Sequence, residues 1–302
     1  MKYNLVVPSM PSDIKLFVNY IEWFFKFLQI NKIIVIGPQK LENALPKGFD
    51  VSFIDENCLI PFSSLRHLFE LRTTDPHALN RIGWYYQQFL KMAYANICDD
   101  EYYLLWDSDT IPLRGINLFD VNGRPILDYK TEYNKTYFET IEKILPGYEK
   151  EFAYSFISEH MLVNTHHMRE LLKSIESNQT ISGSTFYEKI INAIDIKSLA
   201  ESGFSEFETY GTYIFKQYKE TYTTRYWKSM RFGGFFYPKS VLLSETQRKW
   251  LGRHYHAITF EKKDNLSFLS HIVSLPLFLF LFSPICLNVL SFIPRIVRKC
   301  RK

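Results

Sequence analysis

The hydrophobic positions in the first half of the chain form short continuous runs that alternate with stretches of helical spacing. Apolar, β-rich runs stand at residues 3–7, 32–36 and 51–54. Between 14 and 30, and again between 79 and 97, apolar residues recur every three or four positions, which predicts helices. Buried-type strands separated by helices predict a parallel sheet with helices packed on its faces.

The second half of the chain is less regular. The pattern there predicts strands at 124–129 and 231–237, an interrupted strand over 152–163, a helix at 166–175, and an acidic loop that leads into a helix over 205–219. The fold class that follows is α/β, with a Rossmann-type mixed sheet flanked by helices. One domain is predicted over 1–260, and a separate hydrophobic helical extension over 265–302.

Two aspartates follow directly on a predicted strand. The run YYLLW at 102–106 ends at Asp107, and Asp109 stands two positions later, before the apolar IPL. Ligands of open α/β sheets collect at the carboxyl ends of the strands. Paired carboxylate oxygens suit Mg²⁺ or Mn²⁺. A solvated Asp-Ser-Asp turn is the alternative, but the buried-type strand before the pair favours a metal site.

Four stretches carry a resemblance to a known class of enzyme, and they lie between residues 3 and 256. They read GWYYQQFLKMAYA at 83–95, YYLLWDSDTIPL at 102–113, SEHMLVN at 158–164 and SEFETYG at 205–211. In these stretches the chain resembles glycosyltransferases of the GT-A type, and more narrowly a little-characterised bacterial family associated with surface-polysaccharide synthesis. The WDSD tetrapeptide and the helix before it are the specific parts.

The resemblance implies a GT-A-like fold and transfer of a sugar from a nucleotide-sugar donor to a surface glycan or glycolipid acceptor. It implies Mn²⁺ or Mg²⁺ held by Asp107 and Asp109, with Asp107 also facing the donor. Further donor contacts are implied at the end of the first strand and on the helix before the aspartates: Val7, Pro8, Ser9, Arg81, Gln87, Gln88 and Lys91. The alternative for the helix is that its polar side chains face solvent.

Two histidines near the end of the predicted domain are candidate metal ligands. Many GT-A enzymes complete the metal shell with a late histidine, and this chain has His254 and His256 in the right region. Two imidazoles at i and i+2 would share one face of a strand, where neutral nitrogen can ligate Mn²⁺. A surface strand with two titrating histidines is the alternative.

Three glutamates are candidates for the base that an inverting transferase needs to deprotonate its acceptor. Glu206 and Glu208 stand on a predicted loop that opens a helix, and Glu159 precedes His160. Glutamates at a helix start also serve as caps that complement the helix dipole. A retaining enzyme needs no such base, and the stereochemistry stays open.

The end of the chain predicts contact with a membrane. Residues 265–294 form a run of 30 without Asp, Glu, Lys or Arg, with basic residues on both sides and three prolines inside. A kinked membrane-embedded anchor with both flanks at anionic headgroups explains charge and proline together. A spanning helix and a buried helical hairpin are the alternatives.

Composition bears on the partner, the redox state of the cysteines and the cellular location. The net charge of +4 is too mild to indicate nucleic acid as a partner, and the four scattered cysteines show no metal spacing. No apolar leader precedes the first strand, so free thiols in a cytoplasmic protein at the inner membrane are expected. A non-catalytic scaffold and a nucleotidyltransferase are the rival functions. No glycine-rich phosphate loop follows the first strand, which disfavours the latter.

Overall fold

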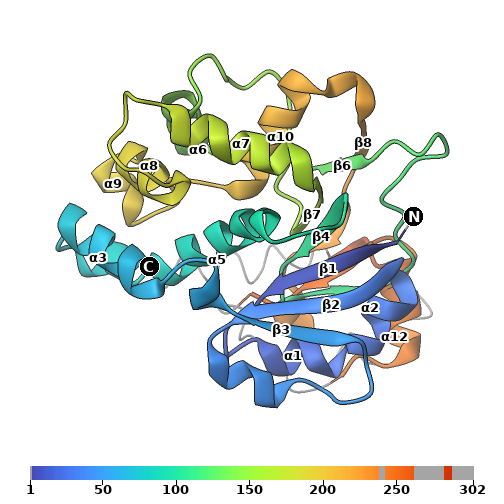
Figure 1. Cartoon of the computed structure of the whole chain (residues 1–302). Coiled ribbons are helices and arrows are strands. Elements are labelled where there is room, and N and C mark those ends of the chain that lie inside the picture. The colour runs from blue at the N-terminus through green and yellow to red at the C-terminus, as the bar shows by residue number, and fades with distance from the viewer. Residues whose placement is uncertain (1, 238–241, 262–281, 288–302) are drawn as a thin grey trace. The chain divides into compact units, whose positions relative to one another are not determined.

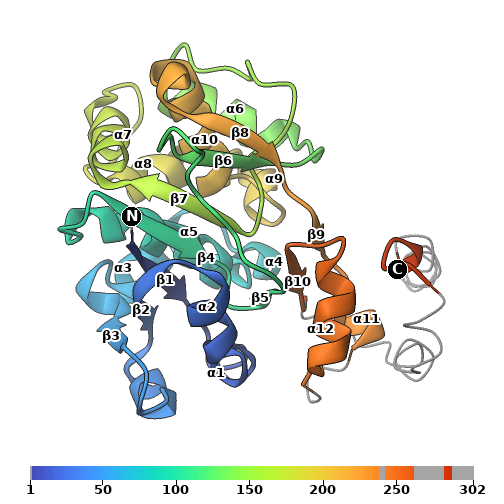
Figure 2. The ribbon, with the colours of Figure 1, turned by 90° about the vertical axis from the view of Figure 1, so that its right-hand side faces the viewer.

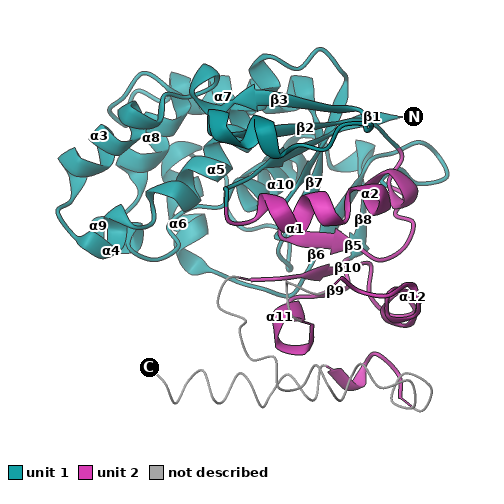
Figure 3. Cartoon of the chain, turned by 90° about the horizontal axis from the view of Figure 1, so that it is seen from below, with its two compact units in different colours: residues 1–11, 30–107, 118–226 teal, residues 12–29, 108–117, 227–302 magenta. Residues whose placement is uncertain are grey.

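The computed structural model describes residues 2–237, 242–261 and 282–287. The chain forms two compact units, coloured separately in Figure 3. Unit 1 comprises residues 1–11, 30–107 and 118–226, and unit 2 comprises 12–29, 108–117 and 227–302. Each unit is assembled from three segments of the chain. One boundary between the units falls between Asp107 and Ser108, inside the predicted metal motif.

A five-stranded mixed sheet forms the centre of unit 1 (Figure 1). Its order is β3 (Val51–Asp55), β2 (Ile30–Gly37), β1 (Tyr3–Pro8), β4 (Tyr102–Trp106) and β7 (His160–Asn164). The first four strands are parallel, and β7 runs antiparallel to β4 with His160 opposite Trp106. The carboxyl ends of β1 to β4 and the start of β7 therefore share one edge. The predicted class, a mixed sheet flanked by helices, is confirmed.

Helices cover one face of this sheet and share its core. The α-helices of unit 1 are α3 (Phe62–Arg72), α4 (Pro76–Leu79), α5 (Ile82–Ala93), α6 (Lys135–Ile144), α7 (Thr165–Ser177), α8 (Phe186–Ala193), α9 (Ile196–Leu199) and α10 (Glu206–Gln217). Short 3₁₀ turns occupy η1 (Gln39–Ala44), η2 (Glu56–Cys58), η3 (Tyr94–Asn96) and η4 (Lys219–Thr221). Val6, Ile34 and Leu105 from the sheet belong to the same buried cluster as Phe89 of α5 and Tyr210 of α10. Burial of this cluster is the main stabilising term.

A parallel two-stranded ribbon lies beside the helices of unit 1. It pairs β6 (Ile126–Tyr129) with β8 (Thr223–Tyr226), as Figure 2 shows. The register places Tyr129 opposite Tyr226. The next residue, Lys130, exchanges backbone hydrogen bonds with Ser155 at 2.8 and 2.9 Å. The ribbon thereby holds the irregular segment 152–157 in place.

Unit 2 is built on a three-stranded sheet of order β5 (Thr110–Pro112), β10 (Ala257–Thr259) and β9 (Ser229–Met230). Its helices are α1 (Ile14–Asn19), α2 (Ile21–Phe27), α11 (Gly233–Phe236) and α12 (Glu245–Gly252). Arg248 of α12 is buried and donates to the Leu113 carbonyl at 2.6 Å, while its guanidinium lies over the Phe27 ring. This side chain ties α12 to both other segments of the unit.

One predicted strand is wrong, and a second is wrong in its first part. Residues 231–237 contain the short helix α11, in which a Cβ on Gly233 would lie 2.7 Å from Ile258, so the turn packs too closely for a side chain. Of 152–163, only the part from His160 onward is a strand, and it extends to Asn164. The predicted helices at 14–30 and 79–97 exist but are each divided, the first at Tyr20 and the second into α4, α5 and η3.

The predicted hydrophobic extension at 265–302 lies outside the described residues except for 282–287. Among the helices that the structure describes, none combines the length and the apolar character needed to cross a bilayer. The boundaries 1–260 and 265–302 therefore stay a prediction.

Candidate active site

Asp107 takes part in a three-residue ionic cluster at the carboxyl end of β4. The ammonium of Lys91, on α5, lies 2.5 Å from Asp107 Oδ1 and 2.6 Å from Glu206 Oε1. The side chains of Lys91 and Glu206 are 6% and 5% exposed, whereas that of Asp107 is 34% exposed. One buried cation thus links a buried carboxylate to a half-exposed one at the sheet edge.

The packing of α5 against α10 creates this cluster. The Glu206 N–H, in the first turn of α10, donates to Gln88 Oε1 at 3.1 Å, and the Gln88 amide donates to the Trp84 carbonyl. The Tyr85 hydroxyl accepts from the Gly203 N–H at 3.0 Å. Gln88 therefore uses its amide to position α10, and the donor contact predicted for it stays a prediction.

One oxygen of the Asp107 carboxylate is open to a cation. Burial disfavours the charged form of Lys91, but the attraction of Asp107 and Glu206 outweighs it and raises the pKa of the ammonium. Burial raises the pKa of Glu206, with Lys91 opposing. Asp107 Oδ2 accepts no hydrogen bond from the residues that the structure describes. That open carboxylate oxygen fits a hard divalent ion.

Glu159 lies beside Asp107 in a conformation that glycine would favour. Its φ is 61°, in the left-handed region, and its carbonyl accepts from the Asp107 N–H at 3.0 Å. Its carboxylate forms a buried ion pair with Lys130. A glutamate in this conformation is costly, and such outliers concentrate at functional sites.

A second buried ionic group adjoins the start of β7. Asp128 accepts from Arg225 Nε and Nη2 at 2.7 Å each, and lies 2.9 Å from His160 Nε2. The other ring nitrogen of His160 faces the Ser158 carbonyl at 2.8 Å. Burial works against the charge on Asp128, but Arg225 and His160 lower its pKa overall. The sequence pattern missed this group because its members come from three separate elements.

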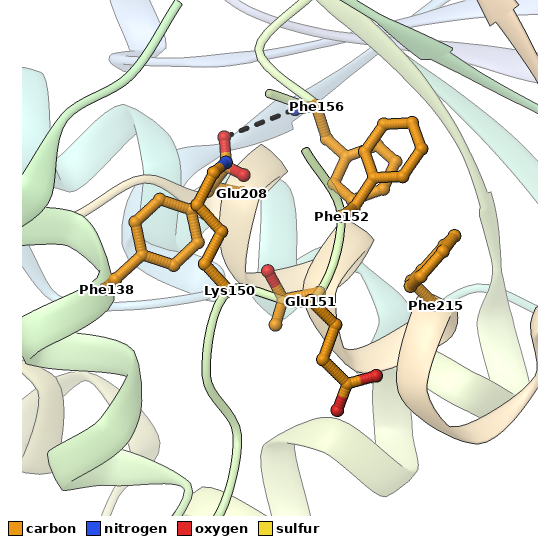
Figure 4. A pocket seen from close by; sticks show the side chains of 8 residues that line it. Phe138, Lys150, Glu151, Phe152, Phe156, Glu208 and Phe215 are labelled. Carbon is orange, nitrogen blue, oxygen red and sulfur yellow. Dashed lines mark hydrogen bonds between the residues drawn. The ribbon is translucent and has the colours of Figure 1, made fainter. Parts of the chain in front are cut away.

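Glu208 also lies in the first turn of α10 and lines a small cavity, half of whose lining residues are phenylalanines (Figure 4). It accepts from the Ser155 hydroxyl at 2.6 Å and the Phe156 N–H at 3.2 Å. Burial raises the pKa of Glu208. The cavity measures about 10 Å³, the lower limit for one water molecule. A Cβ on Gly211 would meet the Phe156 ring at 2.3 Å, so glycine allows this close packing.

Arg81, at the start of α5, has an unsatisfied donor. Its guanidinium lies over the Trp84 ring at 4.0 Å, and its Nη2 reaches Ser202 Oγ at 3.4 Å. Its Nε is buried and finds no hydrogen-bond partner among the described residues. Ten helical positions separate Arg81 from Lys91, roughly 15 Å along the axis. The two cations therefore cannot meet the same phosphate.

The end of β1 is buried. Val7, Pro8 and Ser9 lie at the same sheet edge as Asp107, and the Ser9 N–H donates to the Ile36 carbonyl at 2.9 Å. Their exposed surface is small, so a donor contact there would be made by the backbone edge rather than by projecting side chains.

Asp109 and the two histidines belong to unit 2. The Phe260 N–H donates to the Asp109 carbonyl. The Leu113 N–H donates to the His256 carbonyl. Along the β5–β10 ladder Asp109 and His256 are thus separated by four positions, roughly 13 Å. His256 stacks on Trp227 at 4.6 Å and accepts from the Lys228 N–H. Neither His254 nor His256 lies in a strand, contrary to the prediction, because β10 begins at Ala257.

Metal ligands in a ready-made cluster are not seen in the described part of the chain. No group of three or more His, Cys, Asp or Glu side chains is placed to hold an ion there. An open depression of about 450 Å³ lies elsewhere in unit 1, where Arg72 donates to the Asn192 and Ile194 carbonyls. Arg72 caps the end of α8, which gives it a structural role.

The sequence model of DUF6492, described as a family of unknown function, matches residues 14–264. The chain belongs to this family. None of the curated proteins matches it. Among solved structures, apo mouse xyloside xylosyltransferase 1 matches at 11% identity over 87% of this chain and 99% of its own, with a TM-score of 0.40. The galactosyltransferase LgtC in complex with donor and acceptor sugar analogues matches at 10% identity over 89% and 93%, with a TM-score of 0.42.

Proposed function

We propose that this DUF6492 protein is a metal-dependent glycosyltransferase that moves a sugar from a nucleotide-sugar onto a glycan or lipid-linked acceptor. The observation that carries the proposal is the Asp107 carboxylate at the carboxyl end of β4. It keeps one oxygen open while the other is held 2.5 Å from a buried ammonium. A carboxylate with one open oxygen, at the ligand-binding edge of an α/β sheet, is better placed to bind a cation than to stabilise the fold.

Asp107 and Asp109, two positions apart, would hold Mn²⁺ or Mg²⁺. The ion would supply charge stabilisation for the departing nucleoside diphosphate. Lys91 orients Asp107 through a short ion pair, and Glu206 keeps Lys91 charged in its buried position. His254 and His256 stay sequence-based candidates for a further ligand, but the β5–β10 register gives them no support.

Arg81 is the side chain best suited to a second anionic or polar part of the donor. Its buried Nε has an unmet hydrogen-bonding need, and the Trp84 ring fixes the plane of the guanidinium. A nucleotide-sugar is long enough to extend from the Asp107 end of α5 toward the Arg81 end. Ser9, with Val7 and Pro8, would border the donor through the backbone at the end of β1.

Glu208 is the carboxylate that we assign as the acceptor base if the reaction inverts. Glu206 and Glu159 are each committed to an ion pair with a buried lysine, whereas Glu208 accepts hydrogen bonds from Ser155 and Phe156 and is attracted by Lys150 without a direct ion pair. Its raised pKa makes it a stronger proton acceptor than an exposed glutamate. In a retaining enzyme, Glu208 would bind an acceptor hydroxyl instead.

Residues 265–302 would attach the enzyme to the cytoplasmic face of the inner membrane, next to lipid-linked acceptors. This part of the proposal rests on the uncharged run and its basic flanks alone. Deletion of 265–302 should move the protein from the membrane fraction to the soluble fraction. Full-length protein that is soluble without detergent would contradict membrane attachment.

The test of the function is a screen of purified protein with UDP-, GDP-, CMP- and dTDP-sugars, with and without Mn²⁺. We expect Mn²⁺-dependent release of nucleotide from one donor, and loss of that release in Asp109→Asn. Pyrophosphate release from a nucleoside triphosphate would instead identify a nucleotidyltransferase. Binding without turnover of any donor would identify a scaffold.

A further inference from the structure

Four aromatic side chains form a continuous patch at the open end of the β6–β8 ribbon. We call Tyr129, Phe152, Tyr154 and Tyr226 the tyrosine patch. The ring of Tyr129 stacks on that of Tyr154 with centroids 4.8 Å apart, and meets Phe152 at 5.4 Å and Tyr226 at 5.7 Å. Tyr129 is therefore the centre against which the other three rings pack.

Backbone pairing holds these rings in position. Tyr129 and Tyr226 are direct partners in the β6–β8 register. The neighbouring Lys130 is paired with Ser155, which brings Tyr154 alongside the ribbon. A surface that is ordered before a ligand arrives loses little conformational entropy on binding.

The patch is partly exposed and carries free hydroxyls. Tyr226 and Tyr154 are 45% and 42% exposed. The hydroxyls of Tyr129, Tyr154 and Tyr226 make no hydrogen bond to the part of the chain that is described. Flat apolar rings edged by free hydroxyls match a pyranose, which has an apolar C–H face and a rim of hydroxyl groups.

The patch is continuous with the candidate active site within unit 1. Tyr129 precedes Lys130, whose partner Glu159 accepts the Asp107 N–H through its carbonyl. On its other side, Phe152 stacks on Phe156 at 4.8 Å, and both rings line the Glu208 cavity (Figure 4). The patch is therefore in direct contact with the lining of the Glu208 cavity, and is linked to Asp107 through Lys130 and Glu159.

We infer that the tyrosine patch is a saccharide-binding subsite that holds a pyranose ring of the acceptor. The assignment of the bound saccharide as the acceptor rests on the proposed transferase function. Saccharide binding by the patch does not depend on that function. A bilayer is the competing occupant, since tyrosine is common at membrane interfaces. Three hydroxyls on four rings make the patch more polar than a surface that inserts into lipid.

The experiment compares full-length wild type with Tyr154→Ala/Tyr226→Ala on a printed glycan array, followed by saturation-transfer NMR with the glycans that bind. We expect binding to weaken at least tenfold in the double variant. The Tyr154→Phe/Tyr226→Phe variant keeps the rings and should bind within about threefold of wild type, given that stacking carries most of the affinity. Tyr133→Ala is the matched control, because Tyr133 is a 63% exposed tyrosine that stacks on Phe138 outside the patch.

Donor hydrolysis, measured on the same proteins, separates the two claims. Weakened glycan binding with unchanged donor hydrolysis supports the subsite. Unchanged glycan binding in the double alanine variant, or no glycan bound by wild type, overturns the subsite and leaves the donor claim standing. If wild type binds glycans through the patch but hydrolyses no donor, the transferase proposal fails and the saccharide site remains. Loss of binding to anionic phospholipid vesicles without loss of glycan binding would assign the patch to the membrane.

Discussion

The Lys91 ammonium and the Glu206 carboxylate lie 2.6 Å apart, and both side chains are almost fully buried. Removing the cation would leave the Glu206 carboxyl unpaired in the interior, where burial raises its pKa. We therefore expect Lys91→Met to lower the free energy of unfolding by about 3–5 kcal/mol. Lys91→Met/Glu206→Leu should lose less than the sum of the two single variants, because it removes both charges.

Guanidinium unfolding measures these differences. Arg66→Ala is the control, since it removes an exposed i,i+4 pair with Glu70 that is worth about 0.5 kcal/mol. If Lys91→Met were no more destabilising than Arg66→Ala, the buried cluster would not form as described.

Backbone conformation gives a second prediction at Glu159. Both Glu159→Ala and Glu159→Gly remove the partner of Lys130, but only glycine adopts a φ of 61° without steric cost. Glu159→Gly should therefore be more stable than Glu159→Ala by about 1 kcal/mol. Thermal unfolding of the pair provides the comparison, and an alanine variant equal to or more stable than the glycine variant would argue against the left-handed conformation.

Glu56, which follows β3, predicts a pH dependence of stability. Burial and then Asp55 raise the pKa of Glu56 to about 7, with Lys40 opposing. The folded state thus binds more protons than the unfolded chain between the ordinary pKa of 4.5 and about 7. Stability should be fully present below this window and should fall as the pH rises through it.

The Glu56→Gln variant should lack that fall, and Asp55→Asn should shift it to lower pH. The side-chain carboxyl ¹³C shift of Glu56 should titrate with a midpoint near 7. A midpoint near 4.5 would show that Glu56 is solvated.

Glu208 gives a prediction on catalysis. Because a base must be ionised and burial raises the pKa of Glu208, kcat should increase with pH until that carboxyl is deprotonated. Glu208→Gln should lower kcat about 10²- to 10⁴-fold and remove this pH dependence. Glu142→Gln, on the exposed face of α6, is the matched control and should behave as wild type. A full-rate Glu208→Gln enzyme would mean that the reaction retains configuration or uses another base.

Much of unit 1 could be predicted from the sequence, because its strands are continuous apolar runs and its helices keep a 3.6-residue period. The placement of Asp107 after β4 followed from the same pattern. The 231–237 segment failed since Gly233 and Gly234 interrupt an apolar run that was too short to distinguish a strand from a helical turn.

The sequence pattern could not predict which side chains contact the site residues. Lys91, Asp107 and Glu206 come from three elements far apart in the chain, and only the packing of α5 on α10 brings them together. The same holds for Asp128, His160 and Arg225. Glu206 and Glu208 lie in a helix and not in the predicted loop, because Ser205 caps the start of α10. The Ser205 hydroxyl accepts the Glu208 N–H.

The central claim is that Asp107 and Asp109 hold the divalent ion that binds the donor diphosphate. The most direct measurement is Mn²⁺ binding, followed by electron paramagnetic resonance, in the presence of UDP, GDP, CDP or dTDP in turn. We predict one bound ion per chain with one of these nucleotides, and at least tenfold weaker binding in both Asp107→Asn and Asp109→Asn. Asp99→Asn, an exposed aspartate before β4, should bind as wild type does. Equal Mn²⁺ affinity in wild type and both aspartate variants would contradict the claim.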